Sequence, residues 1–495
     1  MLKKSTIAVT LLCLLALAVS CGETQPTQKE TKASDSSLVT TADTETEAVI
    51  EEKNVRGSDI ASALPTDLDF GGASLTLLSR SEDRYLHEFE AEENGEVVND
   101  AIFKRNRNVS ETLNIDFHVI SRDGQWGAHT DFMKSVSADI MADSKEYDII
   151  SFYAYCNSVM ASEGLLMNLY DLKYIDFEKP WYHQMYIDSA TVYDKLYAIT
   201  GDINLTSISM LDAVYFNKNK LNEYYPDLNI YEMVLDGKWT MDVALGLTKD
   251  VYTDIDGDGK ESEGDFYGFD INGALDLWPV GMGLRYTKRT EEGGYVYDFF
   301  NERNTNIIDS FYDTYNSNTG IYFVDSFKEN RFVEGLSLFT TAGLQYTDKL
   351  RDMKDDYGIL PMFKYDENQE RYYTSISDNS SQILVPTTCK DPDMIGAFIE
   401  CMSEVSYKTV TPAWYETAMK GKYLRDNESC QMFDIITESV WYDFAVINTS
   451  ALGDPVFVTR GAEQRREGNF ASYWKKKEKQ LTKKLEQLLD IYQKH

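Results

Sequence analysis

The sequence contains few of the residues that bind transition metals or form disulfides. Its 495 residues include 5 histidines and 6 cysteines, with no C-x-x-C pair and no H-x-x-x-H pair. Structural zinc sites use four such ligands at short spacings, so a zinc site is not expected. In a large domain a cysteine such as Cys156 is more often a small buried apolar residue, although an exported protein could hold one disulfide.

Basic residues are scarce relative to acidic ones. The chain has 48 Lys and Arg against 82 Asp and Glu, which gives a formal net charge of −34. A surface of this charge repels nucleic acid and anionic lipid, so we expect no nucleic-acid partner. The motifs G-x-S-x-G, H-E-x-x-H and the phosphate loop are also missing, so the sequence carries none of these common signatures of hydrolases and nucleotide-binding proteins.

The apolar run near the N-terminus is too short to span a membrane comfortably. It extends from Ile7 to Val19, follows two lysines and ends in small residues before Cys21. This pattern predicts an export signal over residues 1–20. A cysteine just after a small residue resembles a bacterial lipobox, which predicts that Cys21 is lipidated and anchors the chain at the extracellular face of the cell membrane. The alternative is an ordinary cleaved signal with a cysteine nearby.

Residues 21–65 lack aromatic side chains and any helical or strand period. They are rich in Thr, Ser and Glu. Such a segment cannot bury enough apolar surface to offset its ordering entropy, so it is predicted to be a disordered tether. A flexible tether of ~40 residues would reach ~35 Å on average, which is enough to hold a domain away from a membrane surface.

The remaining residues alternate between strand and helix patterns. Predicted strands cover 73–80, 115–120 and 147–155, and helices between them begin near Asn99 and contain Phe132. Strands separated by helices imply parallel βαβ units and an α/β fold, and the length implies two lobes. The C-terminal segment is predicted to be a packed amphipathic helix with a solvated lysine face. Its apolar stripe consists of Leu481, Leu485, Leu488 and Tyr492.

The stretch TDIDGDGKESEGDFYGF, residues 253–269, resembles an EF-hand calcium loop. Positions 1, 3, 5, 7 and 12 of that loop, counted from Asp254, are Asp254, Asp256, Asp258, Lys260 and Asp265. Alternate residues of a tight turn point their oxygens inward, Gly259 at position 6 lets the chain reverse, and position 7 supplies a carbonyl oxygen. The pattern therefore predicts structural Ca²⁺ as a cofactor. Two alternatives stay open, a solvated acidic loop and a catalytic carboxylate cluster.

The order of several segments resembles the extracellular solute-binding proteins of ABC importers, in the carbohydrate-binding group related to maltose-binding protein. The segments are EYDIISFYAYCNSVMASEGLLMNL, DKLYAI, DAVYFNKNKL, KWTMD, LDLWPVGMG, DYGILPMFK and SSQILVPTTCKDPDMIGAFIECMS. The resemblance covers nearly the whole chain after residue 66. It implies a two-lobed, periplasmic-binding-protein-like α/β fold with hinge strands and a ligand cleft between the lobes. Lobe 1 would comprise 66–211 plus 385–425, and lobe 2 would comprise 212–384 plus 426–495. The chain would cross near Leu211 to Ala213 and return near Ser375 to Val385.

The resemblance also implies ligand-binding residues. The turn after the DII strand would contribute an aromatic and a polar contact, although its tyrosines depart from the usual Trp and Asp. The positions that match are Phe152, Tyr153 and Tyr155, then Asn272, Asp276 and Trp278, then Gln345 and Tyr346. Trp181 and Trp441 are added because aromatic rings cover the C–H face of a sugar. Trp239 matches a core position instead.

These observations predict a lipid-anchored substrate-binding protein with no chemistry of its own. It would act as a monomer, capture a carbohydrate in the interlobe cleft and deliver it to the transmembrane subunits of an ABC permease. The main alternative is a secreted glycoside hydrolase active on polysaccharides, which would need two carboxylates at a fixed separation across a cleft. A surface adhesin is a third possibility, and it would not need a closing cleft.

Overall fold

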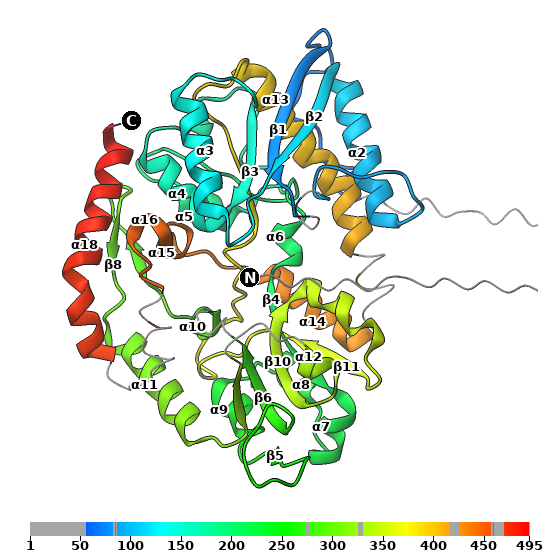
Figure 1. Cartoon of the computed structure of the whole chain (residues 1–495), viewed down its shortest axis with the longest axis vertical. Coiled ribbons are helices and arrows are strands. Elements are labelled where there is room, and N and C mark those ends of the chain that lie inside the picture. The colour runs from blue at the N-terminus through cyan, green and yellow to red at the C-terminus, as the bar shows by residue number, and fades with distance from the viewer. Residues whose placement is uncertain are drawn as a thin grey trace, which may run out of the picture. The chain divides into compact units, whose positions relative to one another are not determined.

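The structure is a computed structural model. It describes residues 56–82, 85, 87–272, 277–324, 330–415, 419, 426–456, 459 and 470–494, without the side chains of 272, 277, 324, 330 and 352. The predicted export signal, Cys21, most of the predicted tether and Asp276 lie outside the described residues. Among the described residues the strands form two larger sheets and one two-stranded sheet, and helices lie around the two larger ones (Figure 1).

The first sheet has the strand order β12-β3-β1-β2. Its strands are β1 (Ala73–Arg80), β2 (Ile115–Arg122), β3 (Ile149–Tyr153) and β12 (Ser381–Leu384). β1 lies parallel to β2 and to β3, and β12 runs antiparallel to β3. All five residues of β3 are buried, as expected for a central strand of a sheet covered on both faces.

Amphipathic helices cover this sheet. They are α2 (Val97–Leu113), α3 (His129–Met141), α4 (Ala154–Ser162) and α13 (Pro392–Val405). The buried positions of α3 are Phe132, Val136 and Ile140, which recur at helical spacing. Phe132 of α3 stacks on Phe152 of β3 at 4.0 Å, and Phe398 of α13 packs on Phe117 of β2 at 4.9 Å between ring centroids. The apolar residues that recur at helical spacing in the sequence are thus the residues through which the helices pack on the strands.

The second sheet has six strands in the order β11-β4-β10-β6-β5, with β9 also paired to β6. They are β4 (Asp212–Asn217), β5 (Tyr252–Thr253), β6 (Phe266–Asn272), β9 (Ile321–Val324), β10 (Ser337–Gly343) and β11 (Tyr357–Leu360). The surrounding helices are α7 (Lys218–Tyr224), α8 (Ile230–Leu235), α9 (Met241–Gly246), α10 (Leu277–Gly281), α11 (Glu302–Ser317), α12 (Asn330–Val333) and α14 (Asn427–Glu438). Trp239 is fully buried here against Phe339 and Phe363, which places it in the core.

The connections between the two sheets pair with each other. Leu211, just before β4, forms an antiparallel bridge with Ile376, and the amide of Asp212 donates to the carbonyl of Ser375 at 3.0 Å. The Ser375 hydroxyl donates to the Asp212 carboxylate at 3.0 Å. The returning segment has joined the first sheet by Ser381, where β12 begins.

The remaining elements lie around these two sheets. They are the 3₁₀ helices η1 (Leu169–Asp171) and η2 (Leu344–Asp352), the π-helical turn η3 (Ser406–Val410), the helices α5 (Gln184–Ala190), α6 (Thr206–Ser209), α15 (Phe444–Ile447), α16 (Thr449–Leu452) and α18 (Phe470–Lys494), and the hairpin β7 (Thr287–Arg289) with β8 (Tyr295–Tyr297). α16 contacts both α4 and α18.

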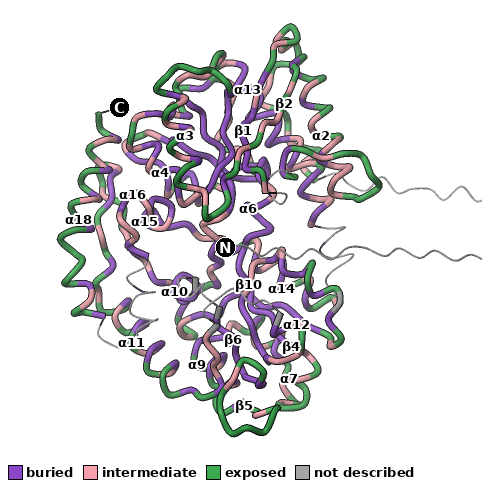
Figure 2. The backbone as a smooth tube through the Cα atoms, viewed as in Figure 1, coloured by how far each residue is buried: buried purple, intermediate pink, exposed green. Residues whose placement is uncertain are grey.

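α18 has the amphipathic pattern that the sequence predicts. Its buried positions include Leu481, Leu485, Leu488 and Tyr492. Lysines such as Lys475 and Lys479 are exposed, and Figure 2 shows exposed positions alternating with buried ones along α18. Within the described parts of the chain, no helix combines the length and the apolar character needed to cross a membrane.

One carboxyl group is buried where α13 meets the segment before α5. Glu400 of α13 is fully buried and accepts from the Tyr182 hydroxyl at 2.6 Å and from the Asp176 amide at 3.2 Å. Burial raises the pKa of Glu400 to about 7, although these two donors oppose the shift. The carboxyl group is therefore easier to protonate in the folded protein than in the unfolded chain.

Replacing this carboxyl group should change how stability depends on pH. The pKa of Glu400 is about 7 in the folded protein and about 4.3 in the unfolded chain. Protonation of Glu400 therefore stabilises the folded state fully below pH 4.3, and this stabilisation is lost as the pH rises to 7. From pH 5 to pH 8 the free energy of unfolding of the native chain should fall by about 2.5 kcal/mol more than that of Glu400→Gln, because one pKa unit corresponds to about 1.4 kcal/mol. Urea unfolding at both pH values measures this. Glu428→Gln, at an exposed position, should behave like the native chain, and an equal fall in Glu400→Gln would contradict the assignment.

Candidate functional site

Polar and aromatic side chains lie at the carboxyl edge of the first sheet. β1 and β3 are parallel, so their carboxyl ends meet at one edge, which is where ligands bind in open α/β sheets. β1 ends at Arg80, whose guanidinium carbon lies 3.2 Å from the ring centroid of Tyr85 and 3.7 Å from that of Tyr153. Its Nη2 donates to the Ser381 hydroxyl at 2.8 Å and to the Asn379 carbonyl at 3.2 Å. Arg80 therefore links the end of β1 to the returning connection.

An exposed indole lies beside this edge. Trp126 is 49% exposed, and its ring centroid lies 4.7 Å from that of His129 and 5.2 Å from that of Tyr155. The Tyr155 hydroxyl donates to the Asp454 carboxylate at 3.0 Å. Burial and the nearby Asp454 carboxylate together raise the pKa of Tyr155 to about 12, so the hydroxyl stays protonated and can donate. Trp126, His129 and Tyr155 together offer aromatic surface next to the hydrogen-bonding atoms of Tyr155 and Asp454.

A cavity of about 150 Å³ opens between α6 and η2. Its lining residues are Leu205, Thr206, Ser209, Gln345, Thr347, Asp348, Trp414 and Met419. Glu88, which is 1% exposed, fixes one wall, because it accepts from the Thr206 amide at 2.8 Å and from the Thr206 hydroxyl at 2.7 Å. Burial raises the pKa of Glu88, and these donors act against that shift. The cavity combines hydroxyl, amide and carboxylate groups with one indole, the mixture expected of a site for a polar ligand.

A second aromatic group lies next to the returning connection. The Trp441 amide donates to the Thr374 carbonyl at 2.9 Å, and the Thr374 amide donates to the Ser439 carbonyl at 2.8 Å. The Trp441 ring lies 5.4 Å from that of Tyr373. Thr374 is two residues before Ile376, so Trp441 is held close to the point where the connections pair.

The structure places the sequence-predicted ligand residues in several different environments. Phe152 and Tyr153 are buried in the first sheet, and Tyr155 is half-buried beside Trp126. Gln345 lines the cavity, and Trp441 is half-buried beside Tyr373. Among the described residues, ring contacts join Phe152 to Tyr153, but they do not join this segment to Trp441.

The other predicted aromatic residues are buried. Trp278 is 1% exposed within the core of the second sheet, where it contacts Phe269, Phe311 and Phe363. Tyr346 packs on Tyr215, and Trp181 packs on Tyr407. Asn272 is the last residue of β6, but its side chain and Asp276 lie outside the described residues.

Sequence reasoning missed Arg80, Trp126, His129 and Trp414. The rule that ligands bind at the carboxyl ends of parallel strands could have identified Arg80, because it is the last residue of a predicted strand. No periodic pattern surrounds Trp126. Trp414 follows a long predicted helix, and nothing in its sequence neighbours indicates that it lines a cavity with Gln345.

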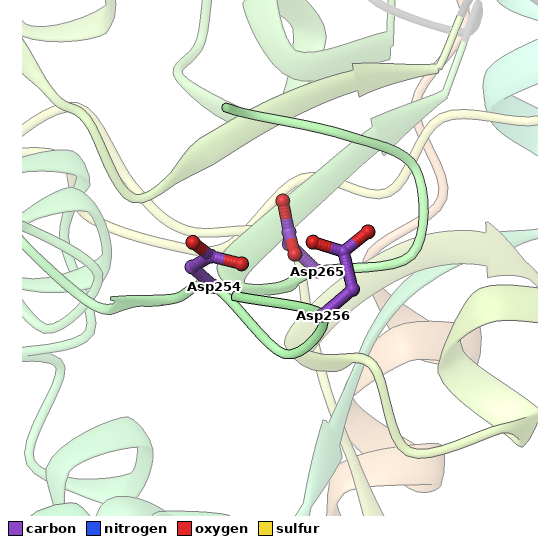
Figure 3. A group of neighbouring side chains, drawn as sticks. All are labelled: Asp254, Asp256 and Asp265. Carbon is purple, nitrogen blue, oxygen red and sulfur yellow. The ribbon is translucent and has the colours of Figure 1, made fainter. Parts of the chain in front are cut away.

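The acidic loop has an ordered turn with converging carboxylates (Figure 3). Asp254 accepts from the amide of Gly257 at 2.6 Å through one oxygen and from the amide of Gly259 at 2.8 Å through the other. Gly259 has φ of +73°, a left-handed conformation that glycine adopts without strain. The chain therefore reverses at position 6, as the calcium-loop pattern requires.

The two ends of this loop are joined by strand pairing. Thr253 pairs with Phe266 where β5 meets β6. One oxygen each from Asp254, Asp256 and Asp265 lies within 4.8 Å of the others, a donor set of hard oxygens that could hold a divalent cation. Asp265 is buried, which acts to raise its pKa, but donors on Ile255, Ser262 and Tyr252 hold it below its usual value. Asp258 does not join this group of three oxygens, and it accepts from the Lys260 amide at 2.8 Å, as Asp256 accepts from the Asp258 amide at 3.0 Å.

Comparison with known proteins supports the fold through structure alone. A scan against protein-family models and a search of curated proteins each found no match. A cyclo/maltodextrin-binding protein complexed with maltotetraose matches with a TM-score of 0.52 and 11% identity, over 85% of this chain and 97% of that one. The maltose/maltodextrin-binding domain MalE from Bdellovibrio bacteriovorus, bound to maltotriose, matches with a TM-score of 0.51 and 11% identity, over 84% and 100%.

A third solved structure agrees with these two. An ABC substrate-binding protein from Listeria monocytogenes in complex with cycloalternan matches with a TM-score of 0.50 and 11% identity, over 83% of this chain and 99% of that one. These matches cover nearly the full length of each solved chain, so they concern the whole architecture of two sheets and their connections. The chain therefore has the two-lobed α/β fold of periplasmic binding proteins, as its sequence predicts.

Proposed function

We propose that this protein is a lipid-anchored substrate-binding protein that captures a carbohydrate between its lobes and delivers it to the transmembrane subunits of an ABC permease. The observation that carries the proposal is the pairing of Leu211 with Ile376, where the connections pass between two sheets that each have helices of their own. Lobes joined by short paired segments can close on a ligand by rotating about them. In the proposed role, this closure would let a permease distinguish the loaded protein from the empty one.

The chemistry of the cavity favours a sugar. A sugar presents a C–H face, which an indole such as that of Trp414 can cover, and a rim of hydroxyl groups, which Gln345 and Asp348 can pair with. A polar site of this kind disfavours ligands without hydroxyl groups, because its own donors and acceptors would be left unpaired. Three proteins of similar fold are described as complexes with maltotetraose, maltotriose and cycloalternan, which supports a carbohydrate ligand here.

The cellular location is proposed from the sequence. A lipid on Cys21 would fix the chain to the extracellular face of the bacterial cell membrane, and the tether would give the lobes room to reach a permease. In this arrangement the protein acts as a monomer, because one chain supplies both lobes.

A hydrolytic activity has less support in the geometry. Burial raises the pKa of Asp202 to about 6 and that of Asp270 to about 6, values that would suit a general acid. However, Asp202 accepts from the Thr411 hydroxyl at 2.5 Å, and Asp270 forms a buried ion pair with Arg331 at 3.0 Å. Both carboxylates are therefore engaged inside the protein, and neither lines the cavity.

We further propose that the acidic loop binds Ca²⁺. Asp254, Asp256 and Asp265 would supply side-chain oxygens, and Lys260 would supply its carbonyl oxygen. Support comes from the convergence of the three carboxylates and from the closed base at Thr253 and Phe266. A bound cation would neutralise repulsion among these carboxylates and hold the loop against β6.

Binding of a carbohydrate is the first test. Full-length protein in a non-ionic detergent, titrated with a panel of oligosaccharides by calorimetry, should bind at least one of them saturably and release no hydrolysed product. Gln345→Ala should weaken this binding about three- to tenfold, the usual effect of one lost hydrogen bond, without lowering the melting temperature. Gln480→Ala, on the exposed face of α18, should keep the native affinity. Turnover of the bound sugar, or no binding by any glycan, would contradict the proposal.

Calcium should stabilise the protein. Adding Ca²⁺ at about 100 times its dissociation constant to chelator-treated protein should stabilise the folded state by about 2.7 kcal/mol and raise the melting temperature by several degrees. Asp254→Asn should abolish the rise, because Asp254 is the first of the convergent ligands. Asp490→Asn, on α18, removes an equal charge and should leave the rise intact. A melting temperature that does not change on addition of Ca²⁺ would contradict the proposal that the acidic loop binds Ca²⁺.

A further inference from the structure

Three arginines lie close together near the returning connection. Arg285, between α10 and β7, and Arg371 both lie over the ring of Tyr373, and Arg303 of α11 is close enough to Arg285 to repel it. In the part of the chain that the structure describes, none of the three forms an ion pair. Arg285 is half-buried, whereas Arg303 and Arg371 are exposed, so solvent screens the charge of Arg285 less than theirs.

Two aromatic rings hold Arg285 in place. Its guanidinium carbon lies 3.7 Å from the ring centroid of Trp441 and 4.4 Å from that of Tyr373. Arg371 lies on Tyr373 as well, at 5.1 Å. Stacking on aromatic faces stabilises a guanidinium group while its N–H donors remain in its own plane. One of the five donors reaches the Leu284 carbonyl at 3.0 Å.

Among the residues that the structure describes, no carboxylate forms an ion pair with Arg285. Burial lowers the pKa of Arg285, Tyr373 and Asp443 act against that shift, and Arg303 adds to it by repulsion. Asp443 is buried and already accepts from three amides and one hydroxyl, those of Tyr286, Thr287 and Ala445. An oxyanion beside Arg285 would offset this repulsion and use the donors that point away from the rings.

The position of the cluster connects it with the proposed ligand site. Trp441 is hydrogen-bonded to Thr374, and Ile376 two residues later pairs with Leu211 at the crossing. Arg285 is therefore held beside the segment about which the lobes would close. A charged group on a ligand held between the lobes could reach it.

We propose that Arg285, held between Trp441 and Tyr373, binds an oxyanion of the ligand, so that the substrate class is an acidic oligosaccharide. The oxyanion is a carboxylate or a sulfate, both of which fit the planar fork of arginine. The positive charges of Arg371 and Arg303 add to that of Arg285 and make the electrostatic potential around it more positive. This inference rests on the proposed function, since it names the substrate class of the same site.

Matched glycans test this inference. Calorimetry on the full-length protein would compare an oligogalacturonate and a sulfated galactan oligosaccharide with a neutral galacto-oligosaccharide of equal length. We expect at least one acidic glycan to bind about tenfold or more tightly than the neutral one, and to lose affinity as NaCl rises from 20 to 500 mM. Which of the two binds identifies the oxyanion as carboxylate or sulfate.

Variants assign the effect to Arg285. Arg285→Gln should weaken binding of the acidic glycan about tenfold or more and change binding of the neutral glycan less than about twofold. Arg107→Gln, which removes an equal charge on α2, should change neither. Arg371→Gln, at an exposed position, should weaken acidic binding about threefold, so the inference stays testable if Arg285→Gln does not fold.

Three outcomes would overturn the inference. The first is a neutral glycan that binds more tightly than both acidic glycans, which leaves the proposed function intact. The second is an equal loss of acidic and neutral binding in Arg285→Gln, which makes the residue structural. The third is the absence of binding by any glycan, which overturns the proposed function and this inference with it.

Discussion

Leu211 and Ile376 pair as an antiparallel bridge at the point where the chain passes between its two sheets. Several of the functional candidates are next to this bridge along the chain or are hydrogen-bonded to its neighbours. Thr206 and Ser209 precede Leu211, and Tyr373 precedes Ile376, while Trp441 is hydrogen-bonded to Thr374. The pairing of the segment at Leu211 with the segment at Ile376 thus helps to position side chains from both lobes. Any rotation of one lobe against the other would change the cavity and the aromatic groups together.

Buried charges reinforce the same region from the side of the first sheet. Arg105 of α2 donates to the Glu88 carbonyl at 2.6 Å and to the Ser406 hydroxyl at 3.2 Å, while Glu88 accepts from Thr206. Burial lowers the pKa of Arg105 to about 9, and Glu88 opposes that shift. These contacts join three elements, which are α2, η3 and α6. Arg105 thus has partners on two other segments, and the loss of either partner would leave a donor of a buried charge unsatisfied.

The fold could be predicted from the sequence because its signals are local. The helical spacing of Phe132, Val136 and Ile140 and the apolar stripe of α18 are readable in single segments, and both became buried faces. The crossing near Leu211 could be predicted only through the resemblance to a known family. The acidic loop was also local, since its turn is made by neighbours such as Asp254 and Gly259.

The candidate site could not be predicted to the same extent, because its contacts join residues far apart in the sequence. Arg80 meets Ser381, and Arg285 meets Trp441, and no spacing rule links such pairs. Aromatic residues add a second difficulty, since the same indole can fill a core or face a sugar. Trp278 and Trp126 have the same chemistry, yet one is 1% exposed and the other 49%. Only packing separates them.

The edge of the second sheet has a feature that opposes the addition of a strand from another molecule. β5 is a two-residue strand at that margin, and it leads directly into the loop of clustered carboxylates. A neighbouring molecule that tried to add a strand there would meet few free backbone groups and strong like-charge repulsion, so this feature guards an acidic protein against edge-to-edge aggregation.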